Sequence, residues 1–167
     1  LLTYPQYWSF RLTGVPANEV SSLGCHTDLW NPRENGYSSL VTALGLGGKM
    51  APAKKAGDCL GALTEELAMQ TGLPAGLPVA CGIHDSNASL YPHLLWREKP
   101  FSVISTGTWV IALAIGGQDV ELDPARDTLI NVNALGDPVP SARFMGGREF
   151  DLVLEGHERG YADADIA

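Results

Sequence analysis

PVACGIHDSNAS, residues 78–89, is the stretch of sequence that decides the fold of this chain. Its apolar first half predicts a buried strand over residues 78–83, and the residues from Asp85 onward predict a helix to about residue 95. Open α/β folds bind ligands at the ends of their strands, so a carboxylate here lies where a substrate would bind. The stretch therefore predicts an α/β fold with a site at Asp85.

A second stretch, FSVISTGTWVI over residues 101–111, predicts two apolar strands, residues 101–105 and 109–115. The turn between them, Ser105–Thr108, is small and rich in hydroxyl groups, and its backbone N–H groups can point at an anion. A base near an anion-binding turn is what phosphoryl transfer to a hydroxyl requires.

The rest of the chain predicts further short elements. Helices are expected over residues 4–13, 37–46, 64–72 and 146–154, and short strands over residues 19–23, 59–63, 129–133 and 142–145. A polar loop is expected at residues 25–32, and the proline-rich run at residues 73–78 is the best candidate for a crossing between domains. The glycine-rich run GLGGKMAP at residues 45–52 lacks the spacing of a phosphate-binding P-loop and is interpreted as a loop.

Composition limits the classes of function. The chain has 167 residues, 45% of them apolar and 18% charged, which is typical of a globular protein. A net charge of −8 and the absence of a basic run argue against nucleic-acid binding but not against ATP binding. No apolar run approaches the roughly 20 residues that cross a membrane. The acidic tail from Glu149 to Ala167 is interpreted as solvated surface.

The cysteines and the termini suggest a location. Cys25, Cys59 and Cys81 form no Cys-x-x-Cys pair, and an odd number of thiols without a visible leader predicts reduced cysteines and a cytoplasmic protein. The absence of a starting Met leads us to expect an excerpt of a longer chain.

Asp85 is the strongest candidate for chemistry. A carboxylate can orient an attacking hydroxyl and take its proton, and the same residue could instead cap the helix that follows. Ser86 and Asn87 could bind substrate hydroxyls. His84 could touch substrate or tune Asp85, or could be an ordinary buried histidine; the sequence leaves these alternatives open.

The turn at residues 105–108 also has two interpretations. Gly107 permits close approach of a phosphate and Thr108 adds a hydroxyl donor, whereas glycine suits any hairpin turn. Trp109 is expected in the core. Arg148 could meet a phosphate, but a salt bridge at the start of a helix is the preferred expectation.

A rival hypothesis is a metal-dependent hydrolase built on His26, Asp28, His84 and Asp85, with His93 as a further candidate. None of these residues has the His-x-His or His-Glu-x-x-His spacing of known metal motifs, so we expect no metal site built by the protein. A serine hydrolase is also disfavoured, because there is no Gly-x-Ser-x-Gly elbow.

Four motifs in order resemble the FGGY family of carbohydrate kinases. They are YPQYWSFRLTG at residues 4–14, AGDCLG at residues 56–61 with TGLPAGLPV at residues 71–79, GIHD ending at Asp85, and the STGT turn ending at Thr108. The resemblance implies ribonuclease-H-like domains of the actin and hexokinase type. It divides the chain into the end of a first domain, residues 1–77, and the start of a second domain, residues 78–167.

The resemblance also implies roles. Asp85 would be the catalytic base, and ATP with Mg²⁺ would be bound by Ser105, Gly107 and Thr108. The sugar or polyol would be bound by a set of polar residues, namely His84, Ser86, Asn87, His26 and Asp28. A homodimer is left open. The neighbourhood of Asp85 is similar to that of kinases for deoxy-ketoses such as fuculose or rhamnulose, while xylulose, glycerol and other polyols stay open.

The sequence also departs from the family pattern. FGGY kinases begin with an Asp-x-Gly-Thr phosphate motif and close with a glycine-rich adenosine-binding segment, and this chain has neither. We therefore expect the 167 residues alone to be inactive or weakly active, because phosphoryl transfer depends on positioning from both sides. The alternative is an actin-like module that binds a sugar or nucleotide without chemistry.

Overall fold

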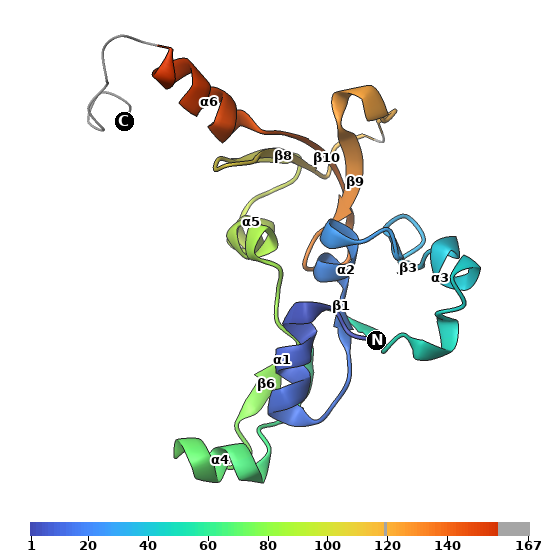
Figure 1. Cartoon of the computed structure of the whole chain (residues 1–167), viewed down its shortest axis with the longest axis vertical. Coiled ribbons are helices and arrows are strands. Elements are labelled where there is room, and N and C mark those ends of the chain that lie inside the picture. Colours follow the sequence, from blue (N-terminus) through green and yellow to red (C-terminus); the bar gives the residue numbers. More distant parts are fainter. Residues whose placement is uncertain (119, 157–167) are drawn as a thin grey trace. The chain divides into compact units, whose positions relative to one another are not determined.

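The computed structural model describes residues 1–118 and 120–156 (Figure 1). These residues form two compact units. The first consists of Leu1–Arg97 with Ile130–Val139, and the second of Glu98–Leu129 and the chain from Pro140 onward. Residues 157–167, which hold most of the acidic tail considered above, lie outside the described residues.

The first unit contains five α-helices and three two-stranded sheets among its described residues. The helices are α1 (Tyr4–Thr13), α2 (Val20–His26), α3 (Ser39–Ala43), α4 (Glu65–Thr71) and α5 (Asp85–Trp96), with a 3-10 turn at Gly47–Lys49. Strand β1 (Asn18–Glu19) pairs in parallel with β4 (Ala53–Lys54). Antiparallel pairs are β2 (Trp30–Asn31) with β3 (Gly36–Tyr37), and β5 (Cys59–Ala62) with β6 (Pro78–Ala80).

The core of this unit gathers around α2. Val20, Leu23, Trp30 and Val132 are all buried and form one apolar cluster. A Cβ atom at Gly24 would lie 2.3 Å from the Val132 Cγ1 atom, so glycine lets α2 approach this part of the chain closely. The same helix therefore has one face in the core and its last turn free to contribute polar groups.

Among the described residues, a larger sheet contains four strands, which lie side by side in the order β7-β8-β10-β9. Their bounds are β7 (Phe101–Ser105), β8 (Val110–Ile115), β9 (Thr128–Val132) and β10 (Pro138–Phe144), with a 3-10 turn at Pro124–Arg126. The β7/β8 and β8/β10 pairs are antiparallel. Helix α6 (Gly146–Glu155) follows β10 after one residue. No helix among residues 1–118 and 120–156 is long and apolar enough to span a membrane.

Most predicted elements are confirmed. The two strands beside the STGT turn, helix α5, helix α1 and helix α6 all lie within one or two residues of their expected bounds. Helix α4 ends at Gly72, whose left-handed φ of 73° is the conformation expected for a glycine that stops a helix. The mixed α/β class is confirmed.

Several local predictions are wrong. Residues 20–23 form the first turns of α2 rather than a strand, because Glu19, the last residue of β1, caps the helix and its carboxylate accepts the free amides of the helix start. The polar loop at 25–32 consequently begins inside α2 and ends in β2, and the helix expected over residues 37–46 is limited to α3.

The strand expected over residues 78–83 is also shorter and less buried than predicted. It ends at Ala80, and Pro78 and Ala80 are both exposed. The physical reason is that β6 has one partner strand, β5, in a sheet of two strands, so the other edge of β6 pairs with no strand in the described part of the chain. The apolar residues of this segment become buried only at Cys81.

Candidate active site

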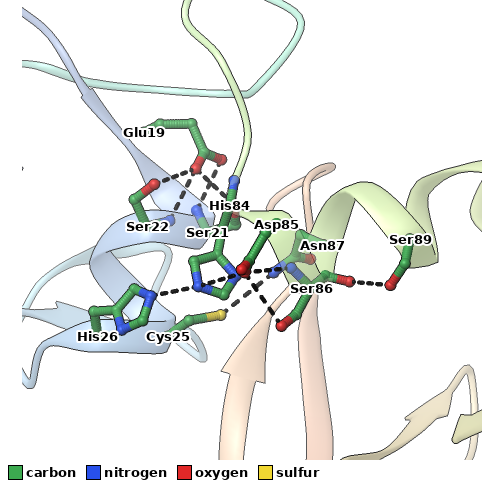
Figure 2. Close-up of polar contacts among 10 residues, drawn as sticks. All are labelled: Glu19, Ser21, Ser22, Cys25, His26, His84, Asp85, Ser86, Asn87 and Ser89. Carbon is green, nitrogen blue, oxygen red and sulfur yellow. Dashed lines mark hydrogen bonds and ion pairs between the residues drawn. The ribbon is translucent and has the colours of Figure 1, made fainter. Parts of the chain in front are cut away.

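The start of α5, drawn in Figure 2, is the candidate site, and the segment that leads into it is anchored to both α1 and α2. The Cys81 carbonyl oxygen accepts hydrogen bonds from Ser9 Oγ at 2.9 Å and from Gln6 Nε2 at 3.4 Å, both on α1. The backbone N–H of His84 donates to Ser21 Oγ of α2 at 3.3 Å. These contacts fix the backbone immediately before Asp85.

A buried carboxylate supports this anchoring. Glu19 is fully buried, and its oxygens accept from the backbone N–H groups of Ser21 and Ser22, each at 2.8 Å. The hydroxyl of Ser21 donates to Glu19 at 2.6 Å and accepts from the His84 N–H, so it links the helix cap to the site. The sequence analysis did not predict that Glu19 caps α2. The available signal was a Glu directly before the Val-Ser-Ser run that begins this helix.

Asp85 is the first residue of α5, and its side chain is 92% exposed. Its Oδ1 atom accepts a hydrogen bond from the Ser86 backbone N–H at 2.6 Å, and this bond lowers the pKa of the carboxyl below 3.8. The cap position itself belongs to His84. Asp85 is therefore an ionised, accessible carboxylate on a fixed backbone, the form in which a carboxylate can accept a proton.

Two histidines meet beside this carboxylate. His84, with a side chain only 10% exposed, lies 3.2 Å through Nε2 from Asp85 Oδ1. Its Nε2 atom also faces Nε2 of His26, the last residue of α2, and the ring centroids are 4.3 Å apart (Figure 2). Burial, and then the neighbouring His26, lower the pKa of His84 below 6.5. His84 is thus both a buried, partnered histidine and a neighbour of the candidate base.

The other two residues of the first turn differ from each other. Ser86 is half-buried and its hydroxyl lies 3.4 Å from Asp85 Oδ1. Asn87 is 5% exposed and donates to Cys25 Sγ at 3.3 Å. Burial raises the pKa of the Cys25 thiol to about 11, so this thiol is a neutral contact for Asn87.

Two residues of the rival hypothesis lie outside this cluster. Asp28 is exposed, and no contact joins its carboxylate to His26, His84 or Asp85 in the described part of the chain. His93 lies in the last turn of α5, where its Nδ1 accepts from Arg97 Nε at 3.2 Å. No group of three or more His, Cys, Asp or Glu residues suited to a metal ion occurs in residues 1–118 and 120–156. The hydrolase hypothesis is not favoured.

The second unit contains its own candidate site, an open pocket of about 400 Å³. It is lined by the turn residues Gly107 and Thr108 and by the start of α6, including Gly147 and Arg148. A Cβ atom at Gly147 would lie 2.5 Å from the Gly107 carbonyl oxygen, so only glycine allows this approach of helix and turn. Sequence reasoning noted the Gly-Gly pair but missed the role of Gly147 in this contact.

Two predictions for this pocket need correction. Trp109 is 45% exposed rather than in the core, because it lies at the end of a hairpin turn. The Arg143 guanidinium lies over its ring, with the Arg143 Cζ atom 5.6 Å from the ring centroid. Arg143 is held there by Asp127, whose Oδ2 accepts from Arg143 Nε at 3.0 Å. The salt bridge expected for Arg148 is absent among the described residues, where Arg148 lines the pocket instead. Ser105 ends β7 just before the turn.

Comparisons with known proteins show which family the chain is similar to. Residues 98–166 match the family described as carbohydrate kinase FGGY, C-terminal domain. A carbohydrate kinase from Novosphingobium aromaticivorans is 45% identical, with a TM-score of 0.85 over 92% of this chain and 35% of that one. The chain belongs to the FGGY family of carbohydrate kinases.

Other FGGY relatives agree. L-fuculokinase from Salmonella typhi is 32% identical over 110 residues, which are 65% of this chain and 23% of that protein. Xylulose kinase from Lactobacillus acidophilus, 15% identical with a TM-score of 0.73 over 91% of this chain and 31% of that one, shows a likeness of fold alone. The chain spans between about a quarter and a third of the length of these relatives.

These comparisons confirm two predictions. The fold is the actin and hexokinase-like fold of FGGY sugar kinases, as the four sequence motifs indicated. The relatives are sugar kinases, which transfer a phosphoryl group to an alcohol acceptor.

Proposed function

We propose that the whole protein phosphorylates a hydroxyl group of a sugar or polyol at the expense of ATP, with Asp85 as catalytic base. The observation that carries the proposal is the placement of Asp85, whose exposed carboxylate begins α5 on an anchored backbone in a chain of the FGGY family. A base that is ionised at neutral pH can accept the proton of an attacking hydroxyl.

The neighbours of Asp85 supply a sugar-binding surface in this proposal. His84 and Ser86 both lie within 3.5 Å of the carboxylate, so they could hold the hydroxyl that attacks or the one beside it. In this proposal His26 contacts His84 rather than the sugar itself, and we keep Asn87 and Asp28 as candidate substrate contacts that a bound sugar would test.

The pocket beside α6 is the proposed phosphate site. The N–H groups of the first turn of a helix have no partners within the helix, and they attract negative charge. The Gly107–Thr108 turn and the space kept open by Gly147 fit a phosphate group, and Ser105 and the Arg148 side chain could add donors. Mg²⁺ would arrive bound to the phosphates of ATP, the usual arrangement for this ion, and would neutralise their charge.

The identity of the sugar follows from the relatives as a proposal. The curated relatives are L-fuculokinases, so a deoxy-ketose such as L-fuculose is the first substrate to try, ahead of xylulose and glycerol. A homodimer, a cytoplasmic location and a domain boundary between residues 77 and 78 stay predictions.

The test is sugar-dependent release of ADP by the whole protein across a panel of ketoses, aldoses and polyols. Asp85→Asn keeps the shape of the side chain but removes the base, and we expect it to lower kcat by roughly 10²- to 10⁴-fold with a much smaller change in KM. The 167-residue chain, run beside it, should be inactive or nearly so. A folded whole protein that binds sugar but releases no ADP would refute the kinase proposal and favour a silent binding module.

A further inference from the structure

The contact between His26 and His84 constrains where protons can lie. The two Nε2 atoms face each other, and His84 Nε2 also lies 3.2 Å from Asp85 Oδ1 (Figure 2). Two bare nitrogens, or two N–H groups, would repel each other across such a contact. One of the two facing nitrogens must therefore carry a proton and the other must be bare.

The surroundings of His84 decide which nitrogen carries it. Its Nδ1 atom is buried without a hydrogen-bond partner among the described residues. A buried N–H without a partner is rarer than an acceptor without one, so the proton of His84 belongs on Nε2. A proton on His84 Nε2 also faces the Asp85 carboxylate oxygen, whereas a bare Nε2 would place its lone pair against that oxygen. His26 Nε2 is then the bare acceptor.

The charges around His84 come from the start of α5 and from the two ends of α2. Asp85 on α5 and Glu19 at the start of α2 favour a protonated ring, while His26 at the end of α2 and burial oppose it. The Glu19 oxygens already accept from two backbone amides and two hydroxyls, and the nearby Cys25 is a neutral thiol. An added proton on His26 would place two N–H groups face to face and break the contact.

We propose that His26 is a positioning residue: it fixes the Nε2–H form of His84, which in turn orients the Asp85 carboxylate, and protonation of the histidine pair disrupts this arrangement. The inference rests on the proposed kinase function and adds a source of acid sensitivity to it. His26 is exposed and 58 residues from His84 in sequence, so its effect on Asp85 passes through the His84 ring.

The test uses three variants of the whole protein. In His26→Gln the amide oxygen can still accept from His84 Nε2–H but cannot take a proton, whereas His26→Leu removes the acceptor. His93→Gln, in the last turn of the same helix as Asp85 and outside the cluster, is the matched control. We measure kcat and KM for the sugar from pH 5 to 9.

We expect His26→Leu to lower kcat about tenfold at every pH with little change in KM, since a displaced base loses catalytic geometry. His26→Gln should stay within about threefold of the natural protein at pH 8 and lose less activity on acidification. His93→Gln should match the natural protein. A tenfold loss shared by both His26 variants, an unchanged acid limb in His26→Gln, or full activity in His26→Leu would each overturn the proposal.

A second measurement separates this inference from the kinase proposal. In whole protein labelled with ¹³C-histidine, the His84 signal should titrate at higher pH in His26→Gln than in the natural protein, because His26 is, after burial, the second cause that lowers the pKa of His84. An unchanged titration refutes the pairing itself, whatever the activity. A shifted titration in a protein that phosphorylates no sugar refutes the kinase proposal and the positioning role with it, while leaving the histidine contact intact.

Discussion

Gly147→Ala is the sharpest structural test of the phosphate pocket. The added Cβ would lie 2.5 Å from the Gly107 carbonyl oxygen and 2.9 Å from Thr108 Cα. Ordinary contact at such a position begins near 3.4 Å, so the helix start and the turn must separate by about 1 Å. Both contacts are with backbone, which has no rotamer to change, and the two walls of the pocket therefore move apart.

Two energies oppose each other in this substitution. Alanine is the better helix former by about 1 kcal/mol, whereas overpacking against fixed atoms costs about 1–3 kcal/mol. We expect a net loss of about 1 kcal/mol in the free energy of unfolding. The functional effect should be larger, because a displacement near 1 Å in a reacting geometry lowers rates by about 10²-fold.

The assay is kcat/KM for ATP in the whole protein, with the urea midpoint measured in parallel. Gly117→Ala is the matched control, since this glycine is exposed, has no left-handed φ, and leaves open space within 4 Å of the position that a Cβ atom would take. If Gly147→Ala binds and uses ATP as well as Gly117→Ala does, the pocket between the turn and α6 is not the phosphate site.

Two further predictions concern stability. Glu19→Ala removes the acceptor of four hydrogen bonds at the start of α2, and we expect it to cost about 3 kcal/mol, measured by urea denaturation; a loss under about 1 kcal/mol would contradict the anchoring role. His84 is held neutral by burial, so the unfolded chain binds its proton near pH 6.5 while the folded chain does so only at lower pH. Stability should therefore fall as pH drops below 6.5, and His84→Gln should reduce this slope in urea denaturation at pH 7.5 and 5.5.

The elements predicted best from sequence are those whose own residues determine them. The hairpin of β7 and β8 has apolar strands on both sides of a glycine turn, and α4 has a glycine at its stop. The start of α2 is wrongly predicted as a strand because its cap is a Glu, whose longer side chain is not among the usual capping residues.

The residues of the candidate site also divide into those that belong to a local sequence motif and those that only the fold brings together. Asp85 and the Gly107–Thr108 turn could be proposed as candidates from the sequence because each is a local motif of the chain, and their roles stay predictions. The contact of His26 with His84 and the approach of Gly147 to Gly107 each join residues about 40 to 60 positions apart, and only the fold brings them together. The prediction for Trp109 is wrong because its apolar ring indicates burial, whereas its cover is a single charged side chain, Arg143.

The anchoring of Asp85 explains how a base can be both accessible and well positioned. Its side chain is almost fully exposed, so side-chain packing cannot hold it in place. Backbone groups hold it instead. Just upstream, the Cys81 carbonyl accepts a hydrogen bond from α1 and the His84 N–H donates one to α2. The Ser86 N–H donates to the carboxylate itself. Because these contacts use main-chain atoms, the backbone position of the base depends on the packing of two helices, while the His84 side chain beside it acts on the orientation of the carboxylate. Substitutions in α1 or α2 that spare every proposed substrate contact should still change kcat.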